Sequence, residues 1–242
     1  MLRRIITSVP NTLTCMNLLC GALSCMFSFS AFDLFGSFLV EQIVWMLIGG
    51  AAVFDFFDGA AARLLNAPSP LGKELDSLSD LVSFGMAPAM LLYNILTDWS
   101  HSAWIPYISL IIPVMGALRL AKFNLDDSQS TTFKGLPIPA NAIFWVGATA
   151  WMGSHAYVGN IAMVIIIVAV ALLMVTDMRM FSLKLKNFRI GENLDRYILM
   201  VAAVAFVAIF GVEGFAYTII LYFILSAMQL KRREKQRVPH RK

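Results

Sequence analysis

Four aspartates fall in two pairs within one short stretch of an otherwise apolar sequence. Asp55 and Asp58 are three residues apart, and Asp76 and Asp80 are four residues apart. On a helix, both spacings place the two side chains of a pair on one face. Because an ionised carboxylate is costly to bury in apolar surroundings, four of them close together indicate a functional site.

The segment between the two pairs predicts how they meet. Residues 66–70 read Asn-Ala-Pro-Ser-Pro, which is typical of a turn, so we expect two antiparallel helices that meet at their ends. Both carboxylate faces would then converge on one point, where cations have to relieve their repulsion. Oxygen ligands without histidine or cysteine suit hard ions such as magnesium, calcium or manganese. The sequence therefore predicts a metal site formed by Asp55, Asp58, Asp76 and Asp80.

The composition indicates that the rest of the chain lies in a membrane. Of its 242 residues, 59% are hydrophobic and only 14% are charged, and the mean hydropathy is +0.73. A soluble domain of this length carries far more charge. The net charge of +4 does not require a nucleic-acid partner, because the basic residues gather in the segments between apolar stretches. We expect a single all-α integral membrane domain over residues 1–242.

Eight apolar segments can be drawn, each near the ~20 residues that cross a bilayer core. We therefore expect eight transmembrane helices. They run over Thr12–Ser30, Val40–Leu65, Leu71–Thr97, Ala103–Phe123, Ile138–Met152, Val158–Thr176, Tyr197–Phe210 and Phe215–Leu230.

The basic residues predict the orientation of these helices. Residues 31–39, 98–102, 153–157 and 211–214 contain no Lys or Arg, whereas the alternate connections and both termini do. The excess of positive charge on the cytoplasmic side of membrane proteins then places both termini in the cytoplasm. The metal site would lie between the second and third spans, near the cytoplasmic face of the cell membrane.

Three polar segments complete this topology. Residues 1–11 are expected to lie at the membrane interface, and residues 177–196 form a cytoplasmic loop. The tail 231–242 is rich in Lys and Arg, which favours contact with anionic headgroups.

Small and basic residues surround the aspartates. Gly59 and Ala62 follow the first pair, and Gly72 precedes the second. Small side chains leave room for a bulky ligand, although they serve helix packing equally well. Arg63 and Lys73 lie beside them, and carboxylates with metal next to basic residues suit a phosphorylated amphiphile.

These residues together resemble the signature of the CDP-alcohol phosphotransferases. All eight fixed positions have the spacing of that signature, and they are Asp55, Asp58, Gly59, Ala62, Arg63, Gly72, Asp76 and Asp80. The resemblance implies an integral membrane enzyme in which the hydroxyl of a second alcohol displaces CMP from a CDP-alcohol. It also implies two divalent metal ions, Mg²⁺ or Mn²⁺, held by the first three aspartates with the fourth close by.

Further segments are similar to the branch of this family that transfers a phosphatidyl group from CDP-diacylglycerol to L-serine. They are residues 10–17, 80–88, 116–124 and 133–140, and the resemblance covers roughly Val9 to Ala140. The branch implies that phosphatidylserine and CMP are the products. The family also implies a homodimer.

The resemblance assigns roles to individual residues. Asp80 would be the catalytic base that takes the proton from the attacking hydroxyl. The CDP-diacylglycerol site would include Asn17, Gly59, Ala62, Arg63 and Gly72. Weaker candidates for binding the acceptor or the diphosphate are Arg119, Lys122, Asn124 and Lys134. Helix packing explains Asn17 equally well, and the lysines could serve only to fix the topology.

Other functions remain open at this point. The same chemistry could use glycerol 3-phosphate or inositol phosphate as the acceptor, or a lipid donor with ether chains. Intramembrane prenyltransferases also combine aspartates with magnesium, but their two aspartate motifs lie far apart in the chain. A transporter for divalent cations or protons would need polar residues that continue to the outer side. The remaining alternative is that the four aspartates serve only the packing of the helices.

Overall fold

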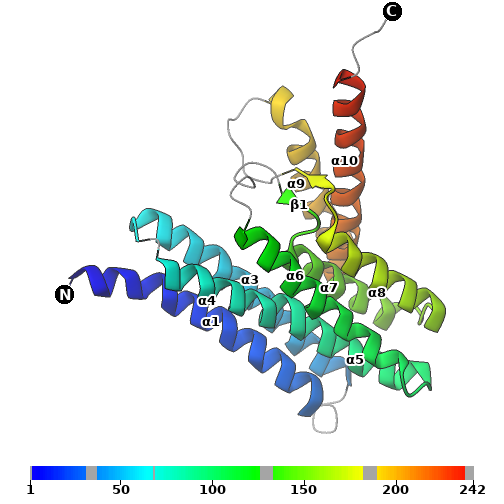
Figure 1. Ribbon diagram of the computed structural model, residues 1–242. Coiled ribbons are helices and arrows are strands. Elements are labelled where there is room, and N and C mark those ends of the chain that lie inside the picture. The colour runs from blue at the N-terminus through cyan, green and yellow to red at the C-terminus, as the bar shows by residue number, and fades with distance from the viewer. Residues whose placement is uncertain (1, 31–36, 68, 126–132, 182–189, 238–242) are drawn as a thin grey trace, which may run out of the picture.

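The computed structural model describes residues 2–30, 37–67, 69–125, 133–181 and 190–237, and nearly all of these are helical (Figure 1). The elements are α1 (Leu2–Ser30), α3 (Ser37–Leu64), α4 (Pro70–Asp80), the π-helix η1 (Leu81–Met86), α5 (Ala87–Ser100), the 3₁₀ helix η2 (Ile105–Leu110), α6 (Ile111–Leu125), β1 (Phe133–Lys134), α7 (Ile138–Ser154), α8 (Asn160–Val175), β2 (Arg179–Met180), α9 (Ile190–Phe210), the 3₁₀ turn η4 (Gly211–Glu213) and α10 (Gly214–Arg237).

Each of the eight apolar segments predicted from the sequence is mostly helical in the structure. Five helical stretches are long and apolar enough to cross a membrane, which agrees with an integral membrane protein. They are Ser8–Phe29, Val40–Leu64, Pro70–Ser100, Ile105–Leu125 and Asn193–Leu230, the last of which covers α9 and α10 together. The number of eight spans stays a prediction.

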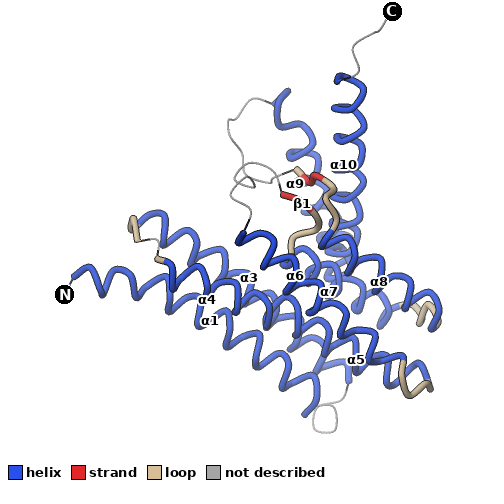
Figure 2. The backbone as a smooth tube through the Cα atoms, in the orientation of Figure 1, coloured by secondary structure: helices blue, strands red, loops and turns tan. Residues whose placement is uncertain are grey.

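The structure adds three local features to the sequence-based description. Helix α1 continues through Pro10, so residues 2–11 and the first expected span form one helix. Helix α9 begins at Ile190, within the loop expected at 177–196. A short antiparallel pair joins β1 to β2, with Lys134 opposite Arg179 (Figure 2). Strands of two residues carry no periodic signal, so the sequence could not reveal this pair.

Helix α1 packs against α3, α4, η1 and α5, which gather around it (Figure 1). Two serines on the α4–η1 segment donate hydrogen bonds to α1: Ser79 to the Thr14 carbonyl at 3.2 Å and Ser83 to the Asn17 carbonyl at 2.9 Å. Gly21 permits this approach, because a Cβ there would lie 2.6 Å from the Ser83 Cα atom. The first helix therefore supports the segment that bears Asp76 and Asp80.

The apolar core lies among α5, η1, α6, α7 and α8. Its largest fully buried side chains include Phe84, Leu91, Ile112, Trp145 and Ile167. Helices α9 and α10 stand together beside this core, and α10 packs against α7 (Figure 1). Buried apolar surface of this kind fixes the helices to one another, and the carboxylate-bearing segments rest on its edge.

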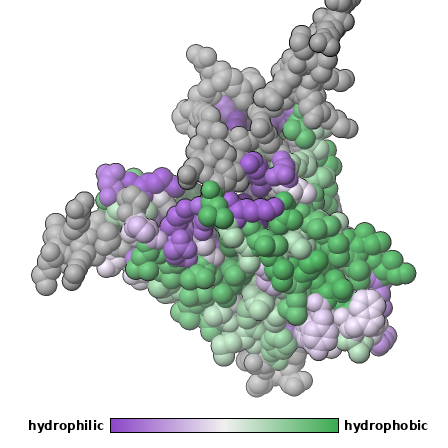
Figure 3. All heavy atoms as spheres, in the orientation of Figure 1, coloured by the Kyte–Doolittle hydropathy of each residue, from purple (hydrophilic) through white to green (hydrophobic). Residues whose placement is uncertain are grey.

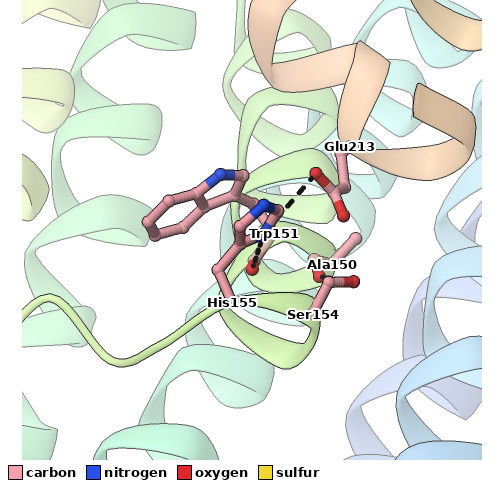
Figure 4. Close-up of polar contacts among 5 residues, drawn as sticks. All are labelled: Ala150, Trp151, Ser154, His155 and Glu213. Atoms are coloured by element: carbon pink, nitrogen blue, oxygen red, sulfur yellow. Dashed lines mark hydrogen bonds and ion pairs between the residues drawn. The ribbon is translucent and has the colours of Figure 1, made fainter. Parts of the chain in front are cut away.

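The end of α7 is tied to η4 by a small polar cluster (Figure 4). The His155 ring stacks on Trp151 with their centroids 4.8 Å apart, and His155 Nδ1 lies 3.9 Å from a Glu213 carboxylate oxygen. His155 Nδ1 also lies 3.1 Å from the Trp151 carbonyl oxygen. Residues 153–157 and 211–214, which the charge pattern places on one side of the membrane, therefore lie next to each other.

We expect Gly21→Ala to lower the free energy of unfolding by about 1–3 kcal/mol, because the new methyl group overlaps backbone that cannot move aside easily. Thermal unfolding of the purified protein in detergent measures this change. Gly49→Ala is the matched control on the neighbouring helix α3, because a Cβ there meets no heavy atom of the described residues within 4 Å. Equal melting temperatures for the two variants would contradict the close packing of α1 on η1.

Candidate active site

A tight turn brings the ends of α3 and α4 together. Asn66 adopts a left-handed conformation with φ of 49°. Its N–H donates to the Arg63 carbonyl at 3.3 Å, and the N–H of Ala67 donates to the Ala62 carbonyl at 3.0 Å. This is the Schellman arrangement that commonly ends a helix, and asparagine tolerates the required φ. The turn predicted from the sequence at residues 66–70 is confirmed.

Helix α4 begins with two residues suited to that position. The Ser69 hydroxyl accepts a hydrogen bond from the N–H of Gly72 at 2.9 Å, and Pro70 occupies the first helical position. A serine cap satisfies a helix N–H that would otherwise lack a partner, and proline has no N–H to satisfy there. The chain thus reverses within five residues and directs α4 back alongside α1.

Three of the four motif aspartates form one cluster. Carboxylate oxygens of Asp55, Asp76 and Asp80 all lie within 4.8 Å of one another. Asp80 is buried, whereas Asp55 and Asp76 are half-buried. Like charges at this separation repel, and an all-oxygen donor set is what hard divalent cations prefer. These three residues could hold a metal ion, and among the described residues they are the group that fits one.

Asp58 lies beside the cluster with a partner of its own. Its carboxylate accepts a hydrogen bond of 2.6 Å from the Thr14 hydroxyl on α1, and it is close enough to Asp55 and Asp76 for electrostatic repulsion. The buried hydroxyl stabilises a carboxylate that would otherwise be desolvated without compensation. The fourth aspartate therefore connects the cluster to the adjacent pocket.

A pocket of about 240 Å³ opens next to the carboxylates. It includes two of the aspartates and all three small residues of the motif. The lining residues are Pro10, Asn11, Thr14, Asp58, Gly59, Ala62, Ala67, Ser69, Gly72, Lys73 and Asp76. Hydrophilic surface gathers on the side of the molecule where α3 and α4 meet and α6 ends, whereas hydrophobic surface covers much of the rest of this face (Figure 3). The pocket suits a polar ligand that enters from this side.

The small residues leave the pocket open. A Cβ on Gly72 would lie 3.0 Å from Ser69 Oγ and 3.1 Å from Asn11 Oδ1, so a larger side chain would crowd this wall. A Cβ on Gly59 would lie 3.5 Å from a guanidinium nitrogen of Arg63. The exposed Arg63 side chain therefore folds back over the glycine at the edge of the pocket.

Asn11, Thr14 and Ser69 line the pocket, although the sequence analysis gave them no role in binding. Lys73, a basic residue that the sequence places beside the carboxylates, also lines it. Asn11 and Thr14 lie within the segment 10–17 that carries the family resemblance, which was the available signal. Nothing in the local sequence distinguishes Ser69 from an ordinary turn residue.

Asn17 lies apart from the pocket and contacts Asp80. Its Nδ2 atom lies 3.4 Å from Asp80 Oδ1, and its Oδ1 atom has no hydrogen-bond partner among the described residues. The side chain is fully buried. The structure thus places Asn17 next to the expected catalytic base.

The four weaker candidates occupy different surroundings. Arg119 is buried in α6, its Nε atom has no partner among the described residues, and it lies close enough to Asp80 for electrostatic attraction. Lys122 extends to the Val175 carbonyl at the end of α8, at 3.5 Å. Asn124 donates to Ser77 Oγ at 2.9 Å. Lys134 is half-buried in β1. Arg119 is therefore the candidate that the fold brings nearest to the carboxylates.

The carboxylate cluster lies on two helices that are candidates for crossing a membrane, beside a pocket lined by several polar side chains. The family model for CDP-alcohol phosphatidyltransferase matches residues 7–206, and the chain belongs to this family.

The relatives agree with this assignment. The chain is 39% identical over 142 residues to a CDP-diacylglycerol–serine O-phosphatidyltransferase of Bacillus subtilis, which covers 54% of this chain and 69% of the relative. It is 35% identical over 179 residues to the enzyme of that name from Methanocaldococcus jannaschii, covering 74% and 75% of the two chains. A Helicobacter pylori relative of the same name is 28% identical over 225 residues, covering 91% and 90%.

We expect Asp76→Asn to weaken Mn²⁺ binding by at least about tenfold, because even indirect partners of metal sites contribute that much. The change removes one negative charge from the cluster and leaves the shape of the side chain unaltered. Electron paramagnetic resonance of free Mn²⁺ during titration of the purified protein measures the affinity. Glu74→Gln, on the same helix but exposed, is the matched control and should bind Mn²⁺ as the unmodified protein does. Equal affinities for both variants would argue against this metal site.

Proposed function

We propose that this protein is a CDP-diacylglycerol–serine O-phosphatidyltransferase, which forms phosphatidylserine and CMP from CDP-diacylglycerol and L-serine. The observation that carries the proposal is the cluster of Asp55, Asp76 and Asp80 at the edge of a polar pocket, in a chain whose relatives bear this name. Those names favour serine over glycerol 3-phosphate or inositol phosphate, and they favour an enzyme over a transporter.

We assign the cytidine diphosphate portion of the donor to the pocket. Gly59, Ala62 and Gly72 leave the necessary space, and Arg63 lies where it can donate charge-assisted hydrogen bonds to a phosphate. Asp55, Asp58, Asp76 and Asp80 would hold two divalent ions, Mg²⁺ or Mn²⁺. When bound, such ions neutralise phosphate oxygens and the charge that develops on the leaving group.

Asp80 is the proposed catalytic base. It takes the proton from the serine hydroxyl while that oxygen forms a bond to the phosphorus that bears diacylglycerol. The bond between this phosphorus and the bridging oxygen of CMP breaks, and CMP leaves with the bonding electrons. The Asn17 amide, 3.4 Å from Asp80, holds the carboxylate in a fixed orientation. Burial of Asp80 keeps bulk water from competing with serine.

Arg119 is the proposed partner of the serine carboxylate. It is buried, and its Nε donor is unpaired among the described residues. It lies close enough to Asp80 for electrostatic attraction. A buried donor without a partner is costly, and an incoming carboxylate would satisfy it. Lys122, Asn124 and Lys134 would serve mainly to hold the ends of α4, α6 and α8 together.

We further propose eight transmembrane spans with both termini and the active site on the cytoplasmic side. Contacts on each side support the alternation. On the inner side, Lys73 reaches the Asn124 carbonyl at 3.3 Å, and β1 pairs with β2. On the outer side, Asn160 donates to the Ser100 carbonyl at 3.0 Å. Segments that the charge pattern assigns to one side thus contact each other. The family resemblance also favours a homodimer.

Release of CMP by the purified protein tests the proposed reaction. With CDP-diacylglycerol and Mn²⁺ or Mg²⁺, we expect release that requires L-serine, with phosphatidylserine as the lipid product. Asp80→Asn should lower kcat by at least about a hundredfold, because general-base catalysis contributes typically 10²–10⁴-fold. Release with glycerol 3-phosphate or inositol phosphate in place of serine would refute serine as the acceptor. No release with any of the three would refute the proposed enzymatic activity.

We expect Arg119→Gln to raise the KM for serine by about tenfold or more, because it removes a charge-assisted hydrogen bond from a buried site. Arg119→Lys should fall between this variant and the unmodified enzyme, since lysine keeps the charge and loses the planar fork. Initial rates at varied serine and saturating CDP-diacylglycerol measure the effect. A raised KM for CDP-diacylglycerol with an unchanged KM for serine would assign Arg119 to the diphosphate instead.

A further inference from the structure

A six-residue π-helix follows directly after Asp80. Helix α4 ends at Asp80, η1 covers Leu81–Met86, and α5 begins at Ala87. Within η1 the backbone bonds reach five residues back, as when the N–H of Ala87 donates to the Val82 carbonyl. A π-helical turn contains one residue more than the corresponding α-helical path, so it rotates the preceding segment by about 100° relative to the following one. The direction in which Asp80 points therefore depends on this turn.

The residues after the turn provide a cause for it. In a regular α-helix the N–H of residue 88 would donate to the carbonyl of Phe84. Pro88 has no N–H, and its ring would collide with that carbonyl. The Phe84 carbonyl instead accepts a hydrogen bond from Asn141 Nδ2 on α7 at 3.2 Å. A side chain from another helix thus supplies the donor that the proline removes.

Asn141 is fixed in this orientation. Its side chain is fully buried, and its Oδ1 atom accepts a hydrogen bond from Trp145 Nε1 at 3.1 Å. Exchange of the two ends of the amide would leave the Phe84 carbonyl facing an oxygen and the indole N–H facing a donor. Because buried polar groups are costly without partners, this network specifies one arrangement.

The segments on both sides of the turn have separate anchors. On the α4 side, Ser79 donates to a carbonyl of α1, and inside the turn Ser83 donates to a second one. On the α5 side, Leu91 and Leu92 are fully buried in the core. A change in the turn cannot be absorbed by free rotation of either helix, so it must alter the position of Asp80 against Asp55 and Asp76.

We propose that Asn141 and Pro88 are positioning residues for the carboxylate cluster: together they maintain the π-helix Leu81–Met86, which directs Asp80 toward Asp55 and Asp76. Neither residue lines the pocket beside the aspartates. The inference rests on the proposed role of Asp80 in metal binding and catalysis. It assigns a function to a polar contact between α7 and η1 that lies outside the aspartate motif.

The test compares three variants with the unmodified protein. Asn141→Leu keeps a similar volume and removes the donor. Asn94→Leu is the matched control, because Asn94 on α5 also donates to carbonyls, those of Ser28 and Met90, but lies beyond the turn. Pro88→Ala combined with Asn141→Leu restores an N–H for the Phe84 carbonyl and permits a continuous α-helix. Each protein is characterised by its melting temperature, its Mn²⁺ affinity and its kcat and KM.

We expect Asn141→Leu to weaken Mn²⁺ binding and to lower kcat, each by about 10–100-fold, the usual effect of removing a residue that orients metal ligands. The KM for CDP-diacylglycerol should change by less than about threefold, because the pocket is untouched. Asn94→Leu should lower the melting temperature while its Mn²⁺ affinity and kcat stay near those of the unmodified protein. The double variant should regain thermal stability but neither Mn²⁺ affinity nor kcat.

Two results would overturn the proposal. One is an Asn141→Leu protein that loses thermal stability, as Asn94→Leu does, yet binds Mn²⁺ with the original affinity. The other is a double variant in which Mn²⁺ affinity and kcat return together with the melting temperature. Absence of CMP release from the unmodified protein would refute the proposed function instead, and the Mn²⁺ titration would still decide the role of Asn141.

Discussion

The free-energy cost of carboxylates in apolar surroundings constrains the whole arrangement. Helix α1 carries no carboxylate between Ser8 and Ser30, yet it provides polar partners for both segments that do. The Thr14 hydroxyl binds Asp58, the Asn17 amide contacts Asp80, and two α1 carbonyls accept bonds from serines of the α4–η1 segment. The helices that carry the aspartates are therefore held in place by a helix that the aspartate motif does not include.

Local signals made the main features predictable from the sequence. The turn at residues 66–70 depends on asparagine, serine and proline acting within a few residues of one another, and the helices depend on long apolar stretches. The separation of Asp58 from the other three aspartates could not be predicted. It depends on how far α3 is rotated against α1, and this rotation is set by packing between segments distant in the chain.

The family resemblance and their charge grouped Arg119 with Lys122, whereas the fold separates them. Three residues of helix correspond to about 4.5 Å along the axis. That distance places Arg119 inside the bundle, while Lys122 reaches the last carbonyls of α8, where a cation is favourable. Sequence spacing could not show which position was buried, because burial depends on where α6 crosses its neighbours.

Irregular backbone surrounds the second aspartate pair on both sides. A Schellman turn and a serine cap precede α4, and a π-helix follows it. Backbone groups that such irregularities leave without helix partners are costly when buried, so side chains must satisfy them. Ser69 and Asn141 fulfil this role at the two ends. Polar residues outside the aspartate motif can therefore determine where Asp76 and Asp80 lie, because they stabilise the backbone path that brings these aspartates to Asp55.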